Sequence, residues 1–248
     1  MAQKESSDEV HFKELRKRVL TWAGSFIIVF FVACYYSKDI LNLLLSYGER
    51  QNLSMQFAYL YPQEIFMQYL SISVSVAFLT TLPILILQIA LFLMPAIDKK
   101  DQIGAVFWFI ASALLFYGGM AFSIFIMIPF VLIYFDGLNT DTVIEGMVSV
   151  EKYISLLKML IYSFGLAFEI PTITAVFTKL RILTPEIMKK IRPVMIVVIF
   201  TIAAFITPPD VLSQFMIAIP MVILYQISIA ICSKMIARRN NRMEEMHG

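Results

Sequence analysis

Apolar residues occur in long runs in this sequence, separated by short polar stretches. A soluble helix or strand keeps one polar face, whereas these runs leave none. Of the 248 residues, 59% are hydrophobic and only 15% are charged. Helices built from such runs are apolar on every side, and a lipid bilayer is the medium in which they are stable. The sequence therefore predicts an all-α integral membrane protein.

Six apolar segments are the candidates for transmembrane helices. They cover residues 19–36, 65–94, 104–135, 154–178, 193–206 and 211–232. The first four are long enough to cross a hydrocarbon core about 30 Å thick, at a rise of about 1.5 Å per residue. We expect one transmembrane domain over residues 1–248, with a polar tail at each end.

The fifth segment is too short to cross alone. Residues 193–206 would form a helix only about 21 Å long. The turn from Thr207 to Asp210 joins this segment to the sixth, and its two prolines prevent one continuous helix. We therefore expect the short fifth and sixth helices to form a hairpin in a locally thinned bilayer.

Lys and Arg are concentrated on one side of the predicted bundle. The N-terminal tail, the loops after the second and fourth segments, and the C-terminal tail are basic. The other side has only Lys38, Arg50 and Lys152, which lie among several acids. By the positive-inside rule, both termini are expected in the cytoplasm.

Glu169 lies well inside the fourth apolar segment. An ionised carboxylate facing lipid there would cost at least about 2.5 kcal/mol, so this side chain must face something else. Pro171 disturbs the preceding helical turn and would create a polar notch beside it. The alternative is a carboxylate that extends along the helix to the membrane interface.

Lys158 precedes Glu169 by about three helical turns and would share its helix face. This pair leaves open a second function, a small proton-coupled secondary transporter centred on Glu169. The sequence shows no internal repeat, which weakens a transporter built from inverted repeats.

Other residues inside the segments indicate helix packing and helix kinks rather than a functional site. Gly118 and Gly119 are typical of close helix packing. Kinked helices are expected at Pro83, Pro129, Pro171 and Pro220. Packing between helices is the expected role of Gln88, Gln214 and Gln226.

Signals of an enzyme, a cofactor or a metal site are missing from the sequence. The two histidines, His11 and His247, lie in the polar tails, and no nucleophile, zinc or phosphate-loop motif occurs. Cys34 and Cys232 lie in separate apolar segments and define no metal site. A net charge of +2 at pH 7 gives no argument for nucleic acid.

Several motifs occur in a fixed order on the six segments. HFKELRKR covers residues 11–18, and a Pro, Gln, Phe, Pro spacing covers 83–95. FYGG follows at 116–119, FGLAFEIP at 164–171 and TPPD at 207–210. In this order the chain resembles the TatC family, the polytopic core subunit of the twin-arginine protein translocase, from about residue 11 to 229.

The resemblance implies a glove-shaped, concave bundle of helices in the bacterial cytoplasmic membrane. Such a protein would be the signal-peptide receptor and core scaffold of a translocase that exports folded proteins. Its partners would be twin-arginine signal peptides, single-helix subunits of the TatA and TatB type, and membrane lipids, within a multimeric complex.

By the family pattern, cytoplasmic acids bind the twin-arginine motif, and these acids map to Glu14 and Asp101. The family usually has Glu at the second position, so Asp101 is shorter by one methylene. Arg16, Phe92 and Pro95 lie in the same matched segments and are expected to line the site. Carboxylates bind arginine through charge-assisted bidentate bonds, while the surrounding bases repel other cations.

Within the membrane, the resemblance implies a second polar site for partner helices. Gln226 stands where many members have Glu, so this contact of the sixth helix would be uncharged. The residues expected at the intramembrane contact are Glu169, Thr207, Asp210 and Gln214.

Overall fold

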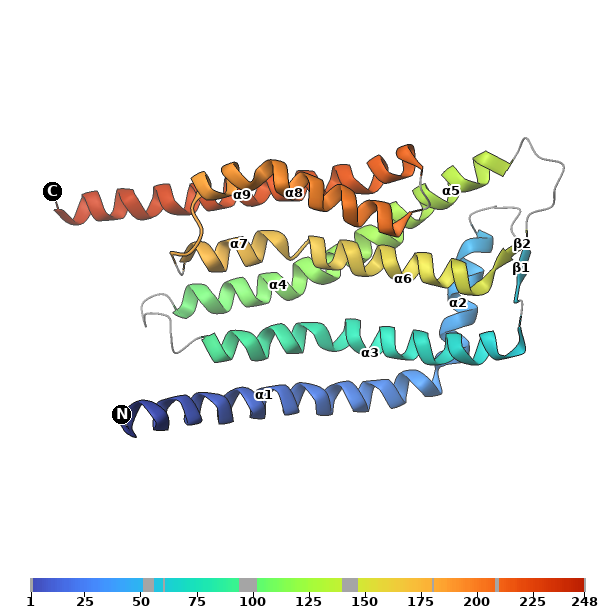
Figure 1. Cartoon of the computed structure of the whole chain (residues 1–248), viewed down its shortest axis with the longest axis horizontal. Helices are drawn as coiled ribbons and strands as arrows, with labels where there is room; N and C mark the ends of the chain where they lie inside the picture. The colour runs from blue at the N-terminus through green and yellow to red at the C-terminus, as the bar shows by residue number, and fades with distance from the viewer. Residues whose placement is uncertain are drawn as a thin grey trace. The chain divides into compact units, whose positions relative to one another are not determined.

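The computed structural model describes residues 2–50, 56–59, 61–93, 102–139, 147–179, 181–207 and 210–247. These residues are almost entirely helical, which confirms the all-α prediction (Figure 1). Among the described residues, five helical stretches are long and apolar enough to cross a membrane: Lys13–Tyr35, Pro62–Ile89, Ile110–Gly137, Val150–Lys179 and Val211–Asn241. They match five of the six expected segments, and the crossing by residues 193–206 stays a prediction.

Backbone contacts divide the chain into two compact units. The first unit contains Met1–Phe109 and Gly146–Ile154, and the second contains Ile110–Glu145 and Ser155–Gly248.

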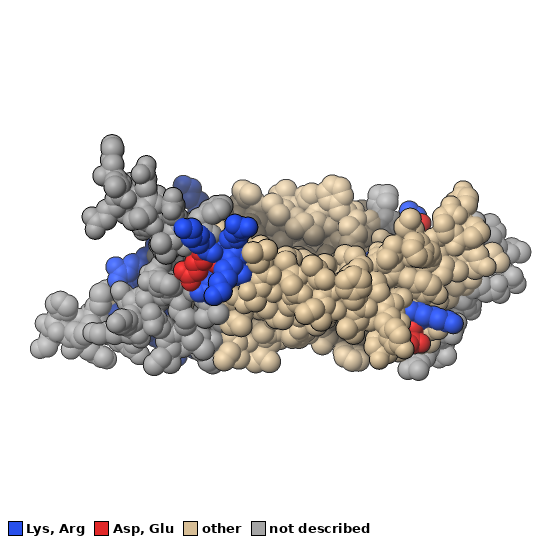
Figure 2. All heavy atoms as spheres, turned by 90° about the horizontal axis from the view of Figure 1, so that it is seen from below, with Lys and Arg blue, Asp and Glu red and all other residues tan. Residues whose placement is uncertain are grey.

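In the first unit, α1 (Ala2–Tyr35) packs along α3 (Pro62–Leu93) (Figure 1). From Val19 to Ser37 the chain has no charged residue, and in α3 the only charged residue is Glu64 at the start. Figure 2 shows the resulting uncharged band, with Lys, Arg, Asp and Glu confined to its ends. This is the surface that a lipid bilayer requires.

A short parallel sheet closes one end of the first unit. Strand β1 (Gln56–Ala58) pairs with β2 (Met147–Ser149), with Phe57 opposite Val148. The buried carboxylate of Glu64 accepts hydrogen bonds from the Ser149 hydroxyl at 3.1 Å and from the Glu151 backbone N–H at 3.2 Å. The sequence analysis did not anticipate these strands, because three-residue strands have no detectable periodicity.

Tyr153 attaches α2 (Ser37–Arg50) to the same end of the first unit. Its hydroxyl donates to the Leu44 carbonyl at 3.0 Å, and its ring lies against Phe57 with centroids 4.8 Å apart. A Cβ atom on Gly48 would lie 2.8 Å from the Tyr153 hydroxyl, so glycine permits this approach. The contacts of Tyr153 thereby hold α2 in place, in addition to its covalent connection to the neighbouring helix.

The third expected segment, 104–135, is not one regular helix. α4 (Gln102–Phe122) leads into a π-helical turn, η2 (Ser123–Met127), which leads into α5 (Ile128–Asn139). Pro129 lacks an N–H and its ring disfavours regular α-helix in the preceding turn, so the backbone widens there. The irregularity expected at Pro129 is confirmed.

The fourth expected segment is also interrupted. α6 (Val150–Ala167) and α7 (Ile170–Lys179) are separated by a turn at Phe168 and Glu169. Pro171 accounts for this break, as the sequence predicted. The prediction that Lys158 and Glu169 lie on one continuous helix is therefore wrong.

α8 (Pro185–Ile206) and α9 (Val211–His247) form an antiparallel pair in the second unit (Figure 1). Pro208 and Pro209 of the connecting turn lie outside the described residues. The Tyr225 hydroxyl of α9 donates to the Met188 carbonyl of α8 at 2.8 Å. This bond fixes the register of the pair.

Three helices extend beyond the apolar segments that predicted them. α1 begins at Ala2 rather than near Val19, and α9 continues past Cys232 to His247. The expectation of a short sixth helix is wrong, because charged residues outside the membrane are good helix formers. α8 begins at Pro185, where Thr184 caps the helix by accepting from the Ile187 N–H at 3.4 Å.

Several buried hydroxyl groups bond to the backbone of their own helix. Each donates to the carbonyl four residues earlier: Ser73, Ser75, Thr81, Thr178, Thr207 and Ser228. A hydroxyl satisfied within its own helix requires no water, which suits a helix in lipid.

The adjacent glycines of α4 have different surroundings. A Cβ atom on Gly119 would lie 2.5 Å from the Phe164 carbonyl oxygen and 2.8 Å from the Cβ of Phe168. A Cβ atom on Gly118 would meet nothing within 4 Å. Close helix packing is thus confirmed at Gly119.

Candidate functional site

Glu14 lies on α1 among basic side chains. Its Oε1 accepts from Arg18 at 2.6 Å (Nη2) and 3.2 Å (Nε), one helical turn away. Lys13, Arg16 and Lys17 have exposed side chains around this pair. Both described hydrogen bonds of Glu14 are accepted by Oε1 and none by Oε2.

The other expected members of this site are only partly described. Asp101 and Pro95 lie outside the described residues. Phe92 belongs to the last turn of α3, but its side chain is also outside them. The proximity of Asp101 to Glu14 therefore stays a prediction.

Glu169 is buried at the break between α6 and α7, with 4% of its surface exposed. Its Oε2 accepts from the Ser112 hydroxyl of α4 at 2.7 Å. Its Oε1 and the Thr172 hydroxyl are buried without a hydrogen-bond partner among the described residues. The alternative of a carboxylate extending to the membrane interface is wrong, and a partner helix would reach Oε1 only after the neighbouring helices part.

Asp210 caps the start of α9. Its Oδ2 accepts from the Ser213 backbone N–H at 2.9 Å and from the Tyr134 hydroxyl of α5 at 2.8 Å. These two bonds favour the ionised carboxylate and hold the pKa of Asp210 below its usual value. Asp210 thus fixes α9 to α5. The nearby Thr207 is buried, and its hydroxyl donates to the Ala203 carbonyl at 3.0 Å.

Replacing Asp210 with Asn is expected to change how stability depends on pH. Because folding lowers the pKa of Asp210, its contribution is complete above the unfolded value of about 3.9 and is lost as pH falls through the folded pKa. Asn retains a capping oxygen but cannot titrate. The melting temperature in detergent, followed from neutral to acidic pH, should fall less steeply for Asp210→Asn than for the parent.

Tyr134→Phe serves as the control for this prediction. It removes one of the bonds that lower the pKa of Asp210, so the acid loss of stability should begin at higher pH. Parallel pH profiles for all three proteins would contradict the assigned role.

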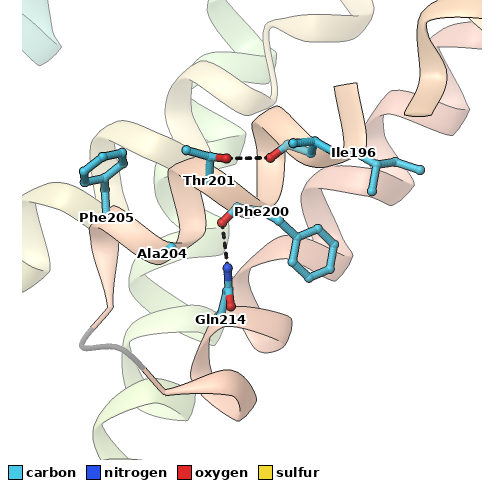
Figure 3. Close-up of a pocket in the computed structure, with 7 residues that line it drawn as sticks. Ile196, Phe200, Thr201, Ala204, Phe205 and Gln214 are labelled. Atoms are coloured by element: carbon cyan, nitrogen blue, oxygen red, sulfur yellow. Dashed lines mark hydrogen bonds between the residues drawn. The ribbon is translucent and has the colours of Figure 1, made fainter. Parts of the chain in front are cut away.

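An open groove of about 420 Å³ lies between α8 and α9 (Figure 3). The groove has an apolar lining and the amide of Gln214 at one side, and Figure 3 shows this amide pointing at the backbone of α8. The amide nitrogen donates to the Phe200 carbonyl at 2.9 Å. The groove is lined by Ile196, Val197, Phe200, Thr201, Ala204, Phe205 and Gln214.

The sequence analysis did not identify two polar partners of the expected site residues. Ser112 holds Glu169 from another helix, and no sequence pattern connects a serine to a carboxylate so far along the chain. Tyr134 holds Asp210 in the same way. The sequence did offer one indication for Tyr134, because it lies near the end of an apolar segment and tyrosines are enriched at membrane interfaces.

Among the described residues, no three His, Cys, Asp or Glu side chains come together as a metal site. The site features are polar groups at helix ends and helix breaks, surrounded by lipid-facing apolar surface. This combination defines a polytopic membrane protein.

Comparison with known proteins gives the family. Residues 10–220 match the family model "Sec-independent protein translocase protein (TatC)". The chain belongs to the TatC family. TatCy of Bacillus subtilis (strain 168) is 33% identical over 89% of this chain and 86% of its own length. TatC of Helicobacter pylori (strain J99) is 34% identical over 89% of this chain and 86% of its own length.

Solved structures agree with this assignment. A crystal structure of the twin arginine translocase receptor TatC has a TM-score of 0.81, with 32% identity, over 89% of this chain and 97% of that one. A second crystal structure of the receptor, in DDM, has a TM-score of 0.82 and covers 90% of this chain and 99% of that one. These matches confirm the family resemblance and give no support to the transporter alternative.

Proposed function

We propose that this protein is the signal-peptide receptor and core scaffold of a twin-arginine translocase that exports folded proteins across the bacterial cytoplasmic membrane. The observation that carries the proposal is the similarity to receptor structures over nine-tenths of the chain. We further propose that both termini lie in the cytoplasm, as the distribution of Lys and Arg favours.

The surroundings of Glu14 suit recognition of paired arginines. Arg18 already occupies one carboxylate oxygen, which holds the side chain in place for a second guanidinium. A charge-assisted bond between carboxylate and guanidinium is short and directional, and a lysine cannot reproduce its planar geometry. The neighbouring Lys13, Arg16 and Lys17 disfavour cations that lack this geometry. We propose Asp101 as the second acid, with Phe92 and Pro95 beside it.

The proposal is tested by binding a signal peptide to the purified protein. Two peptides that differ only in Arg-Arg against Lys-Lys are immobilised, and the retained protein is quantified. We expect the Arg-Arg peptide to retain at least about tenfold more protein, since bidentate bonds are lost with lysine. Equal retention would contradict a twin-arginine receptor.

We propose that the groove between α8 and α9 receives the single helix of a TatA- or TatB-type subunit. An apolar groove with one amide suits a transmembrane helix that carries one polar residue. Gln214 donates to the Phe200 carbonyl through its nitrogen, and its amide oxygen is the acceptor we assign to the partner. Asp210 supports this region by fixing the start of α9 to α5.

Replacing Gln214 with Leu is expected to weaken co-purification of such a subunit. Hydrogen bonds between membrane helices contribute about 0.6 to 1.7 kcal/mol, so retention should fall about 3- to 20-fold. Gln88→Leu is the matched control, because it removes the same group from α3 at membrane depth. An equal loss in both variants, or none in either, would contradict this site.

A further inference from the structure

Three bases within four residues of α8 lie beside an uncharged stretch of α9. Lys189, Lys190 and Arg192 have exposed side chains just before Pro193, where α8 becomes apolar. The bond from the Tyr225 hydroxyl to the Met188 carbonyl places this part of α8 beside the middle of α9. We call these three residues the α8 basic cluster.

Arg192 of the α8 basic cluster contacts α9. With the Gln226 amide oxygen turned toward it, the guanidinium donates two hydrogen bonds, from Nε at 2.7 Å and from Nη2 at 3.1 Å. The next charged residue along α9 is Lys234, about two helical turns or about 12 Å further on. The contact of Arg192 with α9 therefore lies about 12 Å inside the uncharged span of that helix.

Exposed apolar side chains adjoin this charge. Ile223 and Ile227 are 53% and 46% exposed and lie one helical turn apart on α9. Helical geometry puts both of them next to the face that carries Gln226. A cation at this depth cannot stay beside lipid chains without an anion or water.

The described acid that interacts with the α8 basic cluster is Glu186, through Lys189. One acid against three bases leaves a net positive charge. Arg192 retains N–H groups that Gln226 does not use, since a guanidinium has five.

We propose that the α8 basic cluster binds the headgroup phosphate of an anionic phospholipid, with its acyl chains along Ile223 and Ile227. A phosphate accepts bonds from Arg192 and attracts the two lysines as point charges. The short apolar part of α8 draws the headgroup layer toward the membrane centre, which brings a phosphate to this depth. The exposed isoleucines favour a lipid over a free phosphate ion.

The test measures lipid that stays bound to the full chain. The protein is incubated in detergent with phosphatidylglycerol and phosphatidylcholine in equal amounts, purified, and its bound lipid is quantified. The variant Lys189→Gln/Lys190→Gln/Arg192→Gln is compared with Lys234→Gln/Arg238→Gln/Arg239→Gln, which removes the same charge from the end of α9. We expect at least a tenfold loss of bound phosphatidylglycerol in the first variant and less than a twofold loss in the second.

Two further arms keep the test decisive if the first triple variant folds poorly. Gln226→Leu leaves all charges but frees Arg192, and it should lower bound phosphatidylglycerol several-fold, whereas Arg192→Lys with Gln226 intact should lower it less. Excess inorganic phosphate should leave the lipid in place. Equal losses in the two triple variants, no loss in either, or displacement by inorganic phosphate would overturn the proposal.

Discussion

Replacing Glu14 with Lys is expected to abolish the retention of a twin-arginine signal peptide. The change removes a charge-assisted hydrogen bond worth about 1.5–3 kcal/mol and adds a fifth base beside Lys13, Arg16, Lys17 and Arg18, which repels the peptide's arginines. Glu14→Gln keeps the shape of the side chain and loses only the charge, so it should weaken binding about tenfold. Crosslinking of the purified protein to a labelled Arg-Arg peptide measures both effects.

Asp39→Lys is the matched control for Glu14→Lys. Asp39 is an exposed acid at the start of α2, beyond the uncharged stretch of α1, so the same charge change is made at the opposite end of that helix. This control should bind the peptide as the parent does. Undiminished crosslinking of Glu14→Lys, or an equal loss in Asp39→Lys, would exclude Glu14 as a specific contact.

Replacing Gly119 with Ala is expected to lower the free energy of unfolding by about 3 kcal/mol, the upper part of the range for overpacked cores. The new methyl group would lie 2.5 Å from the Phe164 carbonyl oxygen, a backbone atom that cannot rotate away. The helices would have to separate, which also disturbs the aromatic contacts of Phe168 and Phe122. The melting temperature in detergent measures this loss.

Gly118→Ala is the control, and it makes the same chemical change one residue earlier. Its Cβ would meet no atom within 4 Å, so the melting temperature should stay close to that of the parent. Helix propensity alone favours Ala over Gly in both variants, so similar losses in the two would contradict packing at Gly119 as the cause.

The sequence predicted those parts of the fold that depend on local chemistry. Long apolar runs predicted the membrane helices, and Pro129 and Pro171 predicted the two irregular positions. Hydropathy indicates which residues lie in lipid, not where a helix ends. The first expected segment therefore began well after the start of α1, and the sixth ended well before the end of α9.

Contacts between distant segments could not be predicted in the same way. The bond between Ser112 and Glu169 joins residues 57 positions apart, and either residue alone fits many environments. The amide of Gln226 gave no sign that it would meet Arg192. The ion pair of Glu14 with Arg18 is of the predictable kind, because residues four apart on a helix lie side by side whatever the remainder of the chain does.

The pairing of β1 with β2 has a consequence for the order of assembly. The two strands are separated in sequence by α3, α4 and α5, so β2 leaves the ribosome only after those helices have been made. Parallel pairing between distant segments is slow, because the intervening chain must first be placed. Until then β1 lacks its pairing with β2, and the hydrogen bonds from Ser149 and Glu151 to Glu64 have not formed. A nascent chain arrested before Met147 should therefore show protease cleavage near β1 that the finished protein resists.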